Sequence, residues 1–199
     1  MLIEFSKAVA FLLALCFIQS FISRRWADGR TIGLILSGIL FGGICVIGMI
    51  MPIEVSPGVI FDPRSVVISI AGLFGGPVVG GIAAAIAGGY RLWIGGGGAI
   101  VGIAVVASSL LLGLAYRYGI QRGWLRIGVW QLLAFGLIVN AFQIYFFTFL
   151  PKDVIAEVMG SVALPLILIF TPATALLGGL LHLIDDQIKT TKSLLESEK

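Results

Sequence analysis

Long apolar runs dominate the chain, and short polar or glycine-rich stretches separate them. The runs cover residues 5–22, 31–51, 65–89, 99–116, 127–150 and 154–184. Each is long enough for a helix that crosses a bilayer, which needs about 20 predominantly apolar residues. Only helices and closed β-barrels can span lipid, and these runs lack the alternation of barrel strands. The pattern therefore predicts an all-α, polytopic membrane protein.

Gly75, Gly76 and Pro77 interrupt the third run in its middle. Proline is tolerated at the first position of a helix and breaks a helix interior. We therefore expect two helices, residues 62–75 and 77–92, joined by a tight turn. The first would be about 20 Å long at 1.5 Å per residue. Because this is shorter than the bilayer core of about 30 Å, we expect the helix to begin below the outer surface.

The number of membrane crossings depends on this interruption. A turn at the proline gives seven crossings with the N-terminus outside, whereas one unbroken helix gives six crossings with both ends inside. Basic residues gather on the cytoplasmic side of membrane proteins, and the arrangement with seven crossings places more of them there. The sequence therefore favours seven crossings over six, and both arrangements place the C-terminus in the cytoplasm.

Composition excludes several classes of function. Of the 199 residues, 59% are hydrophobic and 12% are charged, with a mean hydropathy of +1.10, which excludes a water-soluble enzyme. The net charge of +3 is too small for a nucleic-acid surface. A single histidine and two cysteines inside apolar runs cannot build a catalytic triad or a metal site. We therefore expect no catalytic residues, no metal, no cofactor and no nucleic-acid partner.

Two arginines, Arg64 and Arg91, stand in apolar surroundings. A charge inside the membrane is costly and marks a functional site by default. With seven crossings both lie in the outer half, about 17–21 Å from the Gly-Gly-Pro turn. The guanidinium fork matches a carboxylate or phosphate, so we predict an anionic ligand. Alternatively, Arg91 extends to the lipid headgroups and Arg64 pairs with Asp62, which is also a suitable N-cap before Pro63.

The loop after the second arginine favours the ligand interpretation. Gly95, Gly96, Gly97 and Gly98 lead into the helix predicted over 99–116. Backbone amides and the helix dipole bind anions at such a position, and glycine allows close approach of a ligand. A merely flexible loop is the alternative.

Three further residues are less specific candidates for the ligand site. Tyr90 adjoins Arg91 and would either wall a pocket or serve as an interfacial aromatic residue. Asn140 and Gln143 are three residues apart, so they share one face of the helix predicted over 127–150. Amides in membranes either bond a neighbouring helix or face a cavity, and both possibilities stay open here.

The end of the chain turns polar after His182. Ile184, Ile188, Thr191 and Leu195 recur at intervals of four, three and four residues, which is typical of a short coiled-coil interface. We therefore expect a membrane domain over 1–184, the start of a cytoplasmic signalling helix over 185–199, and a homodimer through this helix. The absence of a cap suggests that further domains follow in the native protein.

The chain resembles the LytS-type membrane sensors, the five-transmembrane receptor domains that precede bacterial histidine kinases and diguanylate cyclases. The resemblance covers about residues 31–185 and rests on three motifs: Asp62-Pro63-Arg64-Ser65, Ala71-Gly72-Leu73-Phe74-Gly75-Gly76-Pro77, and Tyr90-Arg91 followed by Gly95-Gly96. Some relatives carry Asn-Thr in place of Asp62-Pro63, and some carry Cys and Ser in place of Gly102 and Val105. Leu194 to Lys199 also looks like the lead-in to a PAS domain.

The resemblance implies a receptor in the bacterial cytoplasmic membrane that senses a small carboxylate such as pyruvate and signals through its last helix to a PAS domain and a kinase or cyclase. The membrane fold is similar to the substrate-binding subunits of energy-coupling-factor transporters, so a vitamin-type transport subunit is the alternative. Lipid, a small anion and a second copy of the chain are the expected partners. The predicted ligand-binding residues are Arg64, Arg91, Asp62, Ser65, Tyr90, Gly95, Gly96, Gly97, Gly98, Asn140 and Gln143.

Overall fold

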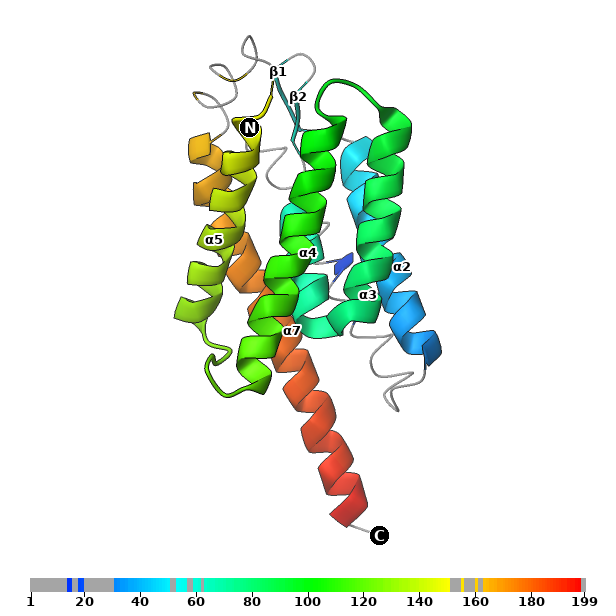
Figure 1. Ribbon diagram of the computed structural model, residues 1–199. Helices are drawn as coiled ribbons and strands as arrows, with labels where there is room; N and C mark the ends of the chain where they lie inside the picture. The colour runs from blue at the N-terminus through cyan, green and yellow to red at the C-terminus, as the bar shows by residue number, and fades with distance from the viewer. Residues whose placement is uncertain are drawn as a thin grey trace.

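The fold consists of long apolar helices and one short β-hairpin (Figure 1). The computed structural model describes residues 14–15, 18–19, 31–50, 53–56, 59–61, 63–150, 155, 160 and 163–197. In chain order the elements are α2 (Thr31–Ile50), β1 (Ile53–Ser56), β2 (Val59–Phe61), α3 (Arg64–Ile94), α4 (Ala99–Gln121), α5 (Val129–Phe147) and α7 (Ala163–Ser197).

The predicted all-helical membrane architecture is confirmed. Five helices in the described part of the chain are long and apolar enough to cross a bilayer. They correspond to the predicted runs from 31–51 onward, and α4 continues further than the predicted 99–116. The predicted total of six or seven crossings is not confirmed, because only five spans qualify among the described residues. The run over 5–22 lies mostly outside these residues.

Helix α3 is folded back on itself at Gly76, as the Gly-Gly-Pro motif predicts. Gly76 has φ 72° and ψ −163°, which lies outside helical geometry and is open to glycine without a steric penalty. A first limb of residues 64–75 therefore precedes the break, and a second limb begins at Pro77. A methyl group built on Gly80 would lie 3.0 Å from the Cα atom of Gly72, so the two limbs pack closely beside the turn.

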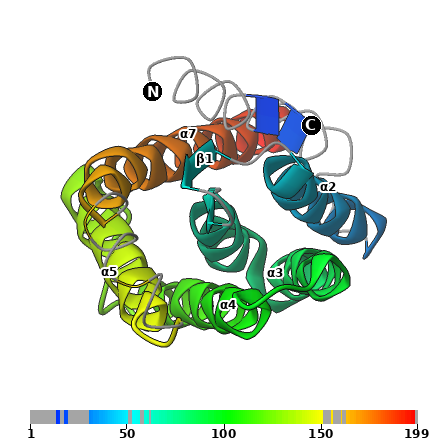
Figure 2. The same ribbon diagram turned by 90° about the horizontal axis from the view of Figure 1, so that it is seen from above.

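The first limb of α3 lies at the centre of the bundle. Seen from above, α2, the second limb, α4, α5 and α7 surround it (Figure 2). The side chains of Val66, Val67, Ile68 and Ile70 are fully buried. A helix that is apolar on all sides is suited to such a position. The limb is therefore the core of the domain, and any displacement of it would be felt by the helices around it.

Glycines allow the surrounding helices to approach this core. The Gly113 position of α4 lies against the backbone carbonyl of Ser69. On the other side, a methyl group built on Gly178 of α7 would meet Ile70 at 3.3 Å and Leu132 of α5 at 3.0 Å. Small residues at such contacts are how membrane helices gain close packing. The first limb thus has direct contact with α4, α5 and α7.

The β-hairpin was not predicted, since the sequence indicated only that the helix after residue 61 would begin below the outer surface. Ile53 pairs with Phe61 in an antiparallel ladder of β1 and β2. Its β-branched and aromatic residues favour strands. The hairpin lies at the end of the bundle opposite the C-terminus (Figure 1). We call this the β-hairpin end and the opposite one the tail end.

Helix α7 is continuous across the predicted domain boundary at residue 184. It extends from Ala163 to Ser197, and its last turns project beyond the other helices at the tail end (Figure 1). Only its portion Leu166–Gln187 qualifies as a membrane span. The division into a membrane domain and a cytoplasmic helix, and the homodimer through that helix, remain predictions.

Candidate functional site

Arg64 opens the first limb of α3 at the β-hairpin end. Pro63 precedes it with φ −79°, and the carbonyl of Pro63 accepts the backbone amide of Val67 at 3.0 Å. The Arg64 side chain is only 8% exposed, and its Nη1 donates to the Sδ atom of Met49 on α2 at 3.3 Å. The predicted partner Asp62 lies outside the described residues, so its pairing with Arg64 remains a prediction.

Ser65 is the next residue of the first limb and is fully buried. Its hydroxyl has no hydrogen-bond partner among the residues that the structure describes. A buried polar group without a partner is rare in native proteins and calls for an explanation. The group lies in the first turn of a buried helix, where the helix dipole also favours an anion.

Arg91 lies near the end of the second limb and points into the bundle. It is 7% exposed, and its Nη1 donates to the carbonyl oxygen of Gly95 at 2.7 Å. Methyl groups built on Gly98 and Gly102 of the α4 side would lie 3.2 Å from Nη2 and 2.9 Å from Nε. The side chain therefore rests against α4, and the alternative in which it extends to lipid headgroups is wrong.

Gly102 was missed as part of the site. Its missing side chain leaves the space that the Nε and Cγ atoms of Arg91 occupy. The available signal was its spacing, since Gly98 and Gly102 are one helical turn apart and form a surface without side chains. Such a surface accommodates a long side chain from a neighbouring helix.

The four glycines between α3 and α4 form a tight connection around Arg91. Gly95 and Gly96 have φ values of 71° and 87°. The amide of Gly95 donates to the Arg91 carbonyl at 3.3 Å, and the amide of Ala99 donates to the Gly96 carbonyl at 3.0 Å. The Gly95 amide is therefore engaged within the chain, and the loop helps to position Arg91. Anion binding by the amides of Gly96, Gly97 and Gly98 remains a prediction.

Asn140 and Gln143 face the bundle interior from α5, as their spacing predicts. They are 0% and 5% exposed, whereas Tyr145 on the opposite face is 58% exposed. The Nδ2 of Asn140 donates to the Oγ1 of Thr171 on α7 at 3.1 Å. Within the described part of the chain, Asn140 Oδ1 and Gln143 Oε1 have no hydrogen-bond partner. Asn140 thus donates a hydrogen bond to a neighbouring helix, and its carbonyl oxygen remains available as an acceptor.

Tyr90 is partly buried and packs against the apolar core. Its ring centroid lies 5.5 Å from that of Trp93, which is 80% exposed. Trp93 therefore faces the surroundings of the bundle, as an interfacial aromatic residue does. Whether Tyr90 also walls a ligand site remains a prediction.

The polar side chains of the β-hairpin end lie within a few ångströms of one another in height along the bundle. Ile70 and Leu132 share a level, since both contact Gly178. At 1.5 Å per residue, Ser65 lies about 8 Å and Asn140 about 12 Å above that level. The contact of Gly72 with Gly80 places Arg91 about 14 Å above it by the same rise. The first limb therefore begins slightly below the level at which the surrounding helices present these side chains.

These side chains form a buried polar layer. Residues 63–150 include Arg64 and Arg91 and contain no Asp or Glu. All five members of the layer are more than nine-tenths buried: Arg64, Ser65, Arg91, Asn140 and Gln143. Guanidinium and hydroxyl groups are donors of the kind that bind small anions, and amide oxygens are acceptors.

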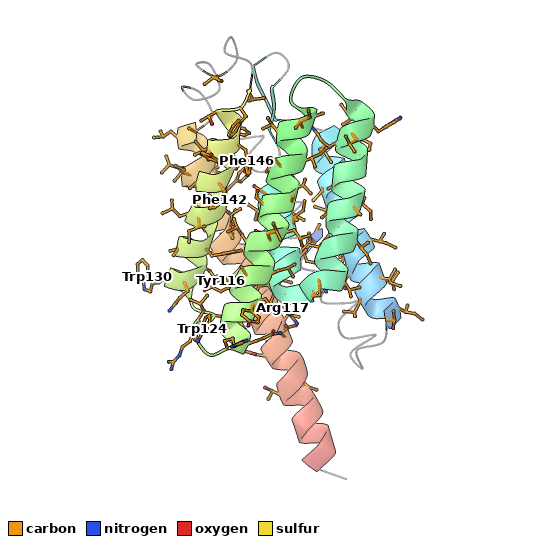
Figure 3. All side chains as sticks on the ribbon, viewed as in Figure 1. Tyr116, Arg117, Trp124, Trp130, Phe142 and Phe146 are labelled. Carbon is orange, nitrogen blue, oxygen red and sulfur yellow. The ribbon has the colours of Figure 1, made fainter. Side chains whose placement is uncertain are left out.

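The tail end carries a contact that sequence reasoning missed. Nη1 of Arg117 on α4 donates to the carbonyls of Leu73 and Phe74, at 2.9 and 2.7 Å. These carbonyls end the first limb, and the guanidinium also lies beside Gly76, with Nε 3.3 Å from a methyl group built there. Figure 3 places Arg117 in the lower half of the bundle, whereas Trp130 points away from it. A cation at a helix C-terminus stabilises it.

Comparison with known proteins gives one match. The model of the family described as 5TMR of 5TMR-LYT matches residues 16–184, which is most of the chain. No curated protein and no solved structure matches the sequence or the fold.

Proposed function

We propose a receptor function for this chain, which belongs to the family of five-transmembrane receptor domains described as 5TMR of 5TMR-LYT. In this proposal it is a membrane sensor without catalytic activity of its own. The ligand is a small anionic metabolite, a carboxylate such as pyruvate, that enters from outside the cell. The β-hairpin end then faces outward, and the projecting part of α7 lies in the cytoplasm of a bacterial cell.

The observation that carries this proposal is the burial of two arginines at one end of the bundle. Arg64 and Arg91 are 8% and 7% exposed, and both belong to membrane-spanning α3. A guanidinium inside a membrane protein is costly and by default serves a functional site. Carboxylates are natural occupants because they accept two parallel hydrogen bonds from the guanidinium fork.

The local helix geometry supports an anion at the same position. The first limb starts at Arg64 and points its N-terminal dipole toward the β-hairpin end (Figure 1). The buried hydroxyl of Ser65 lies in its first turn and has no partner in the described residues. A carboxylate placed there would accept hydrogen bonds from the guanidinium, the hydroxyl and the first backbone amides.

Signal transmission follows from the contacts of the first limb. Ile70 meets α7 at Gly178, and Asn140 bonds Thr171 on α7. A ligand that moves the first limb or α5 would therefore shift α7, which continues beyond the bundle as far as Ser197. The shift is limited by the difference in ligand affinity between the two states. We propose that α7 passes it, within a homodimer, to a PAS domain and a kinase or a diguanylate cyclase.

Calorimetric binding to the full chain in nanodiscs tests the proposal. Acetate, propionate, pyruvate, lactate and succinate form the panel. Arg64→Met and Arg91→Met each remove one guanidinium, and Arg122→Met is the matched control because Arg122 lies on the surface beside Tyr118. We expect saturable binding of at least one acid, weakened about 100-fold or more in either test variant and unchanged in the control. Absence of binding, or binding that survives both substitutions, would overturn the proposal.

A further inference from the structure

We infer that the ligand carries a hydrogen-bond donor, a hydroxyl or an ammonium group, in addition to its carboxylate. This inference rests on the proposed function, since it assigns the second half of the same ligand. The donor group would bind the Oδ1 atom of Asn140 and the Oε1 atom of Gln143. These two atoms on α5 face the interior of the bundle at the β-hairpin end.

The first support is that both acceptors are buried without a donor. Asn140 and Gln143 are 0% and 5% exposed, and neither amide oxygen has a hydrogen-bond partner among the described residues. The two residues belong to one helix face, and their Cα atoms are about 4–5 Å apart along its axis by the helical rise. Two neighbouring acceptors without donors on one helix face indicate that a bound molecule supplies the donors.

The second support is the orientation of the Asn140 amide. Its Nδ2 donates to the Oγ1 of Thr171 at 3.1 Å, so the carbonyl oxygen is the part of the amide that remains for a ligand. An amide oxygen only accepts hydrogen bonds. A keto oxygen finds no donor in these oxygens, whereas a hydroxyl or ammonium group would satisfy them.

The third support is the nature of the facing wall. Arg91 lies against Gly102 on α4, and the next turn of α4 presents the buried, apolar Val105. Helix α4 therefore provides space for the arginine and no polar side chain at these two positions. The next buried polar side chain of α4 is Ser109, one turn further toward the tail end, so the amide acceptors at the level of Arg91 come from α5.

The vertical spacing sets the size of the ligand. Asn140 lies about 4–5 Å and Gln143 about 9 Å above Ser65 along the bundle, by the rise per residue from the Ile70 and Leu132 level. By this rise, a donor on the next one or two carbons of a carboxylate at Arg64 and Ser65 lies near the level of Asn140, and Gln143 lies about 4–5 Å higher. A hydroxy or amino acid of three or four carbons fits this spacing.

Matched acids test the inference on the full chain in nanodiscs. Propionate, pyruvate, lactate and alanine share three carbons and differ in one group: none, a keto oxygen, a hydroxyl or an ammonium. Succinate, oxaloacetate, malate and aspartate repeat the comparison with four carbons. We expect a donor-bearing acid to bind about tenfold or more tightly than the keto and unsubstituted acids of its series. The hydroxy and amino arms show which donor is used.

Variants of α5 assign that preference to the two amides. Gln143→Met and Asn140→Leu remove one acceptor each at similar volume, and Tyr145→Phe removes a hydroxyl from the exposed face of the same helix as a control. We expect each test variant to reduce the preference for the donor-bearing acid over the unsubstituted acid of its series about tenfold. A Gln143→Met variant that binds every acid equally less tightly would overturn the inference.

Failure of this inference differs from failure of the proposed function. Keto or unsubstituted acids that bind as tightly as their donor-bearing partners, with binding still dependent on Arg64 and Arg91, would overturn the donor alone. Absence of arginine-dependent binding for all eight acids would overturn the proposed function and the inference with it.

Discussion

The two ends of the first limb of α3 differ in whether their buried polar groups have hydrogen-bond partners. At the tail end, Arg117 donates to the carbonyls of Leu73 and Phe74, so the polar groups of the helix terminus are satisfied within the chain. At the β-hairpin end, the hydroxyl of Ser65 is fully buried and has no partner in the described part of the chain. The C-terminal end of this helix thus has a side-chain donor for two of its carbonyls, whereas its N-terminal end has a buried hydroxyl without a partner among the described residues.

This difference indicates that the tail end stabilises the fold and the β-hairpin end binds the ligand. Satisfied groups at the tail end stabilise the fold, because buried carbonyls without donors are costly. Open groups at the β-hairpin end lower stability until a ligand supplies partners. Substitutions at the tail end should therefore change stability first, and those at the β-hairpin end should change ligand binding first.

The largest expected effect is loss of the guanidinium at the tail end. Arg117→Met leaves the carbonyls of Leu73 and Phe74 without their side-chain donor. We expect a decrease of about 2–3 kcal/mol in the free energy of unfolding, measured by denaturant titration in detergent micelles. Arg122→Met, on the surface beside Tyr118, should change stability little. Equal stability of Arg117→Met and the parent chain would contradict the comparison.

The turn itself should be the next most sensitive position. Gly76→Ala forces a side chain into φ 72°, and we expect a loss of about 1–2 kcal/mol of stability. Gly81→Ala is the control, because Gly81 is helical and has nothing within 4 Å of an added methyl group. The same denaturant titration measures both. A neutral Gly76→Ala would show that the turn does not require glycine.

At the β-hairpin end, Gly102→Ala should impair binding more than stability. The added methyl group would lie 2.9 Å from Nε of Arg91, and the flexible arginine can move away from it. We expect about tenfold weaker binding of pyruvate or lactate, which is about 1.4 kcal/mol, because the guanidinium is displaced. Gly88→Ala, with open space around it, is the control. Unchanged affinity in Gly102→Ala would separate Arg91 from the ligand.

The smallest effect is expected for Ser65→Ala. Removing a buried hydroxyl without a partner leaves stability unchanged or slightly higher. Binding of the same acids should weaken about threefold, as expected for one lost neutral hydrogen bond. Calorimetry and denaturant titration on the same preparation measure both quantities. A marked loss of stability would show that this hydroxyl is structural after all.

Features set by local chemistry were predictable from the sequence, and those set by tertiary contacts were not. Proline after two glycines predicted the break in α3, and the isolation of Arg64 and Arg91 in apolar surroundings predicted a buried polar site. The Arg117 contact joins residues more than 40 positions apart, and no local pattern identifies it. The space at Gly102 depends on how the second limb packs against α4. The strands of the β-hairpin have only four and three residues, too few for an alternating pattern to identify them.

Thermal unfolding of two variants, with and without a bound acid, tests the central claim most directly. The probe is whichever of pyruvate and lactate binds the parent chain more tightly, because a ligand that binds the folded state raises its unfolding temperature. We predict that Arg91→Met loses the ligand-induced increase, even though the lost hydrogen bond to Gly95 also lowers its unfolding temperature somewhat. Arg117→Met should unfold at a lower temperature and keep the increase. An increase retained in Arg91→Met and lost in Arg117→Met would contradict the account.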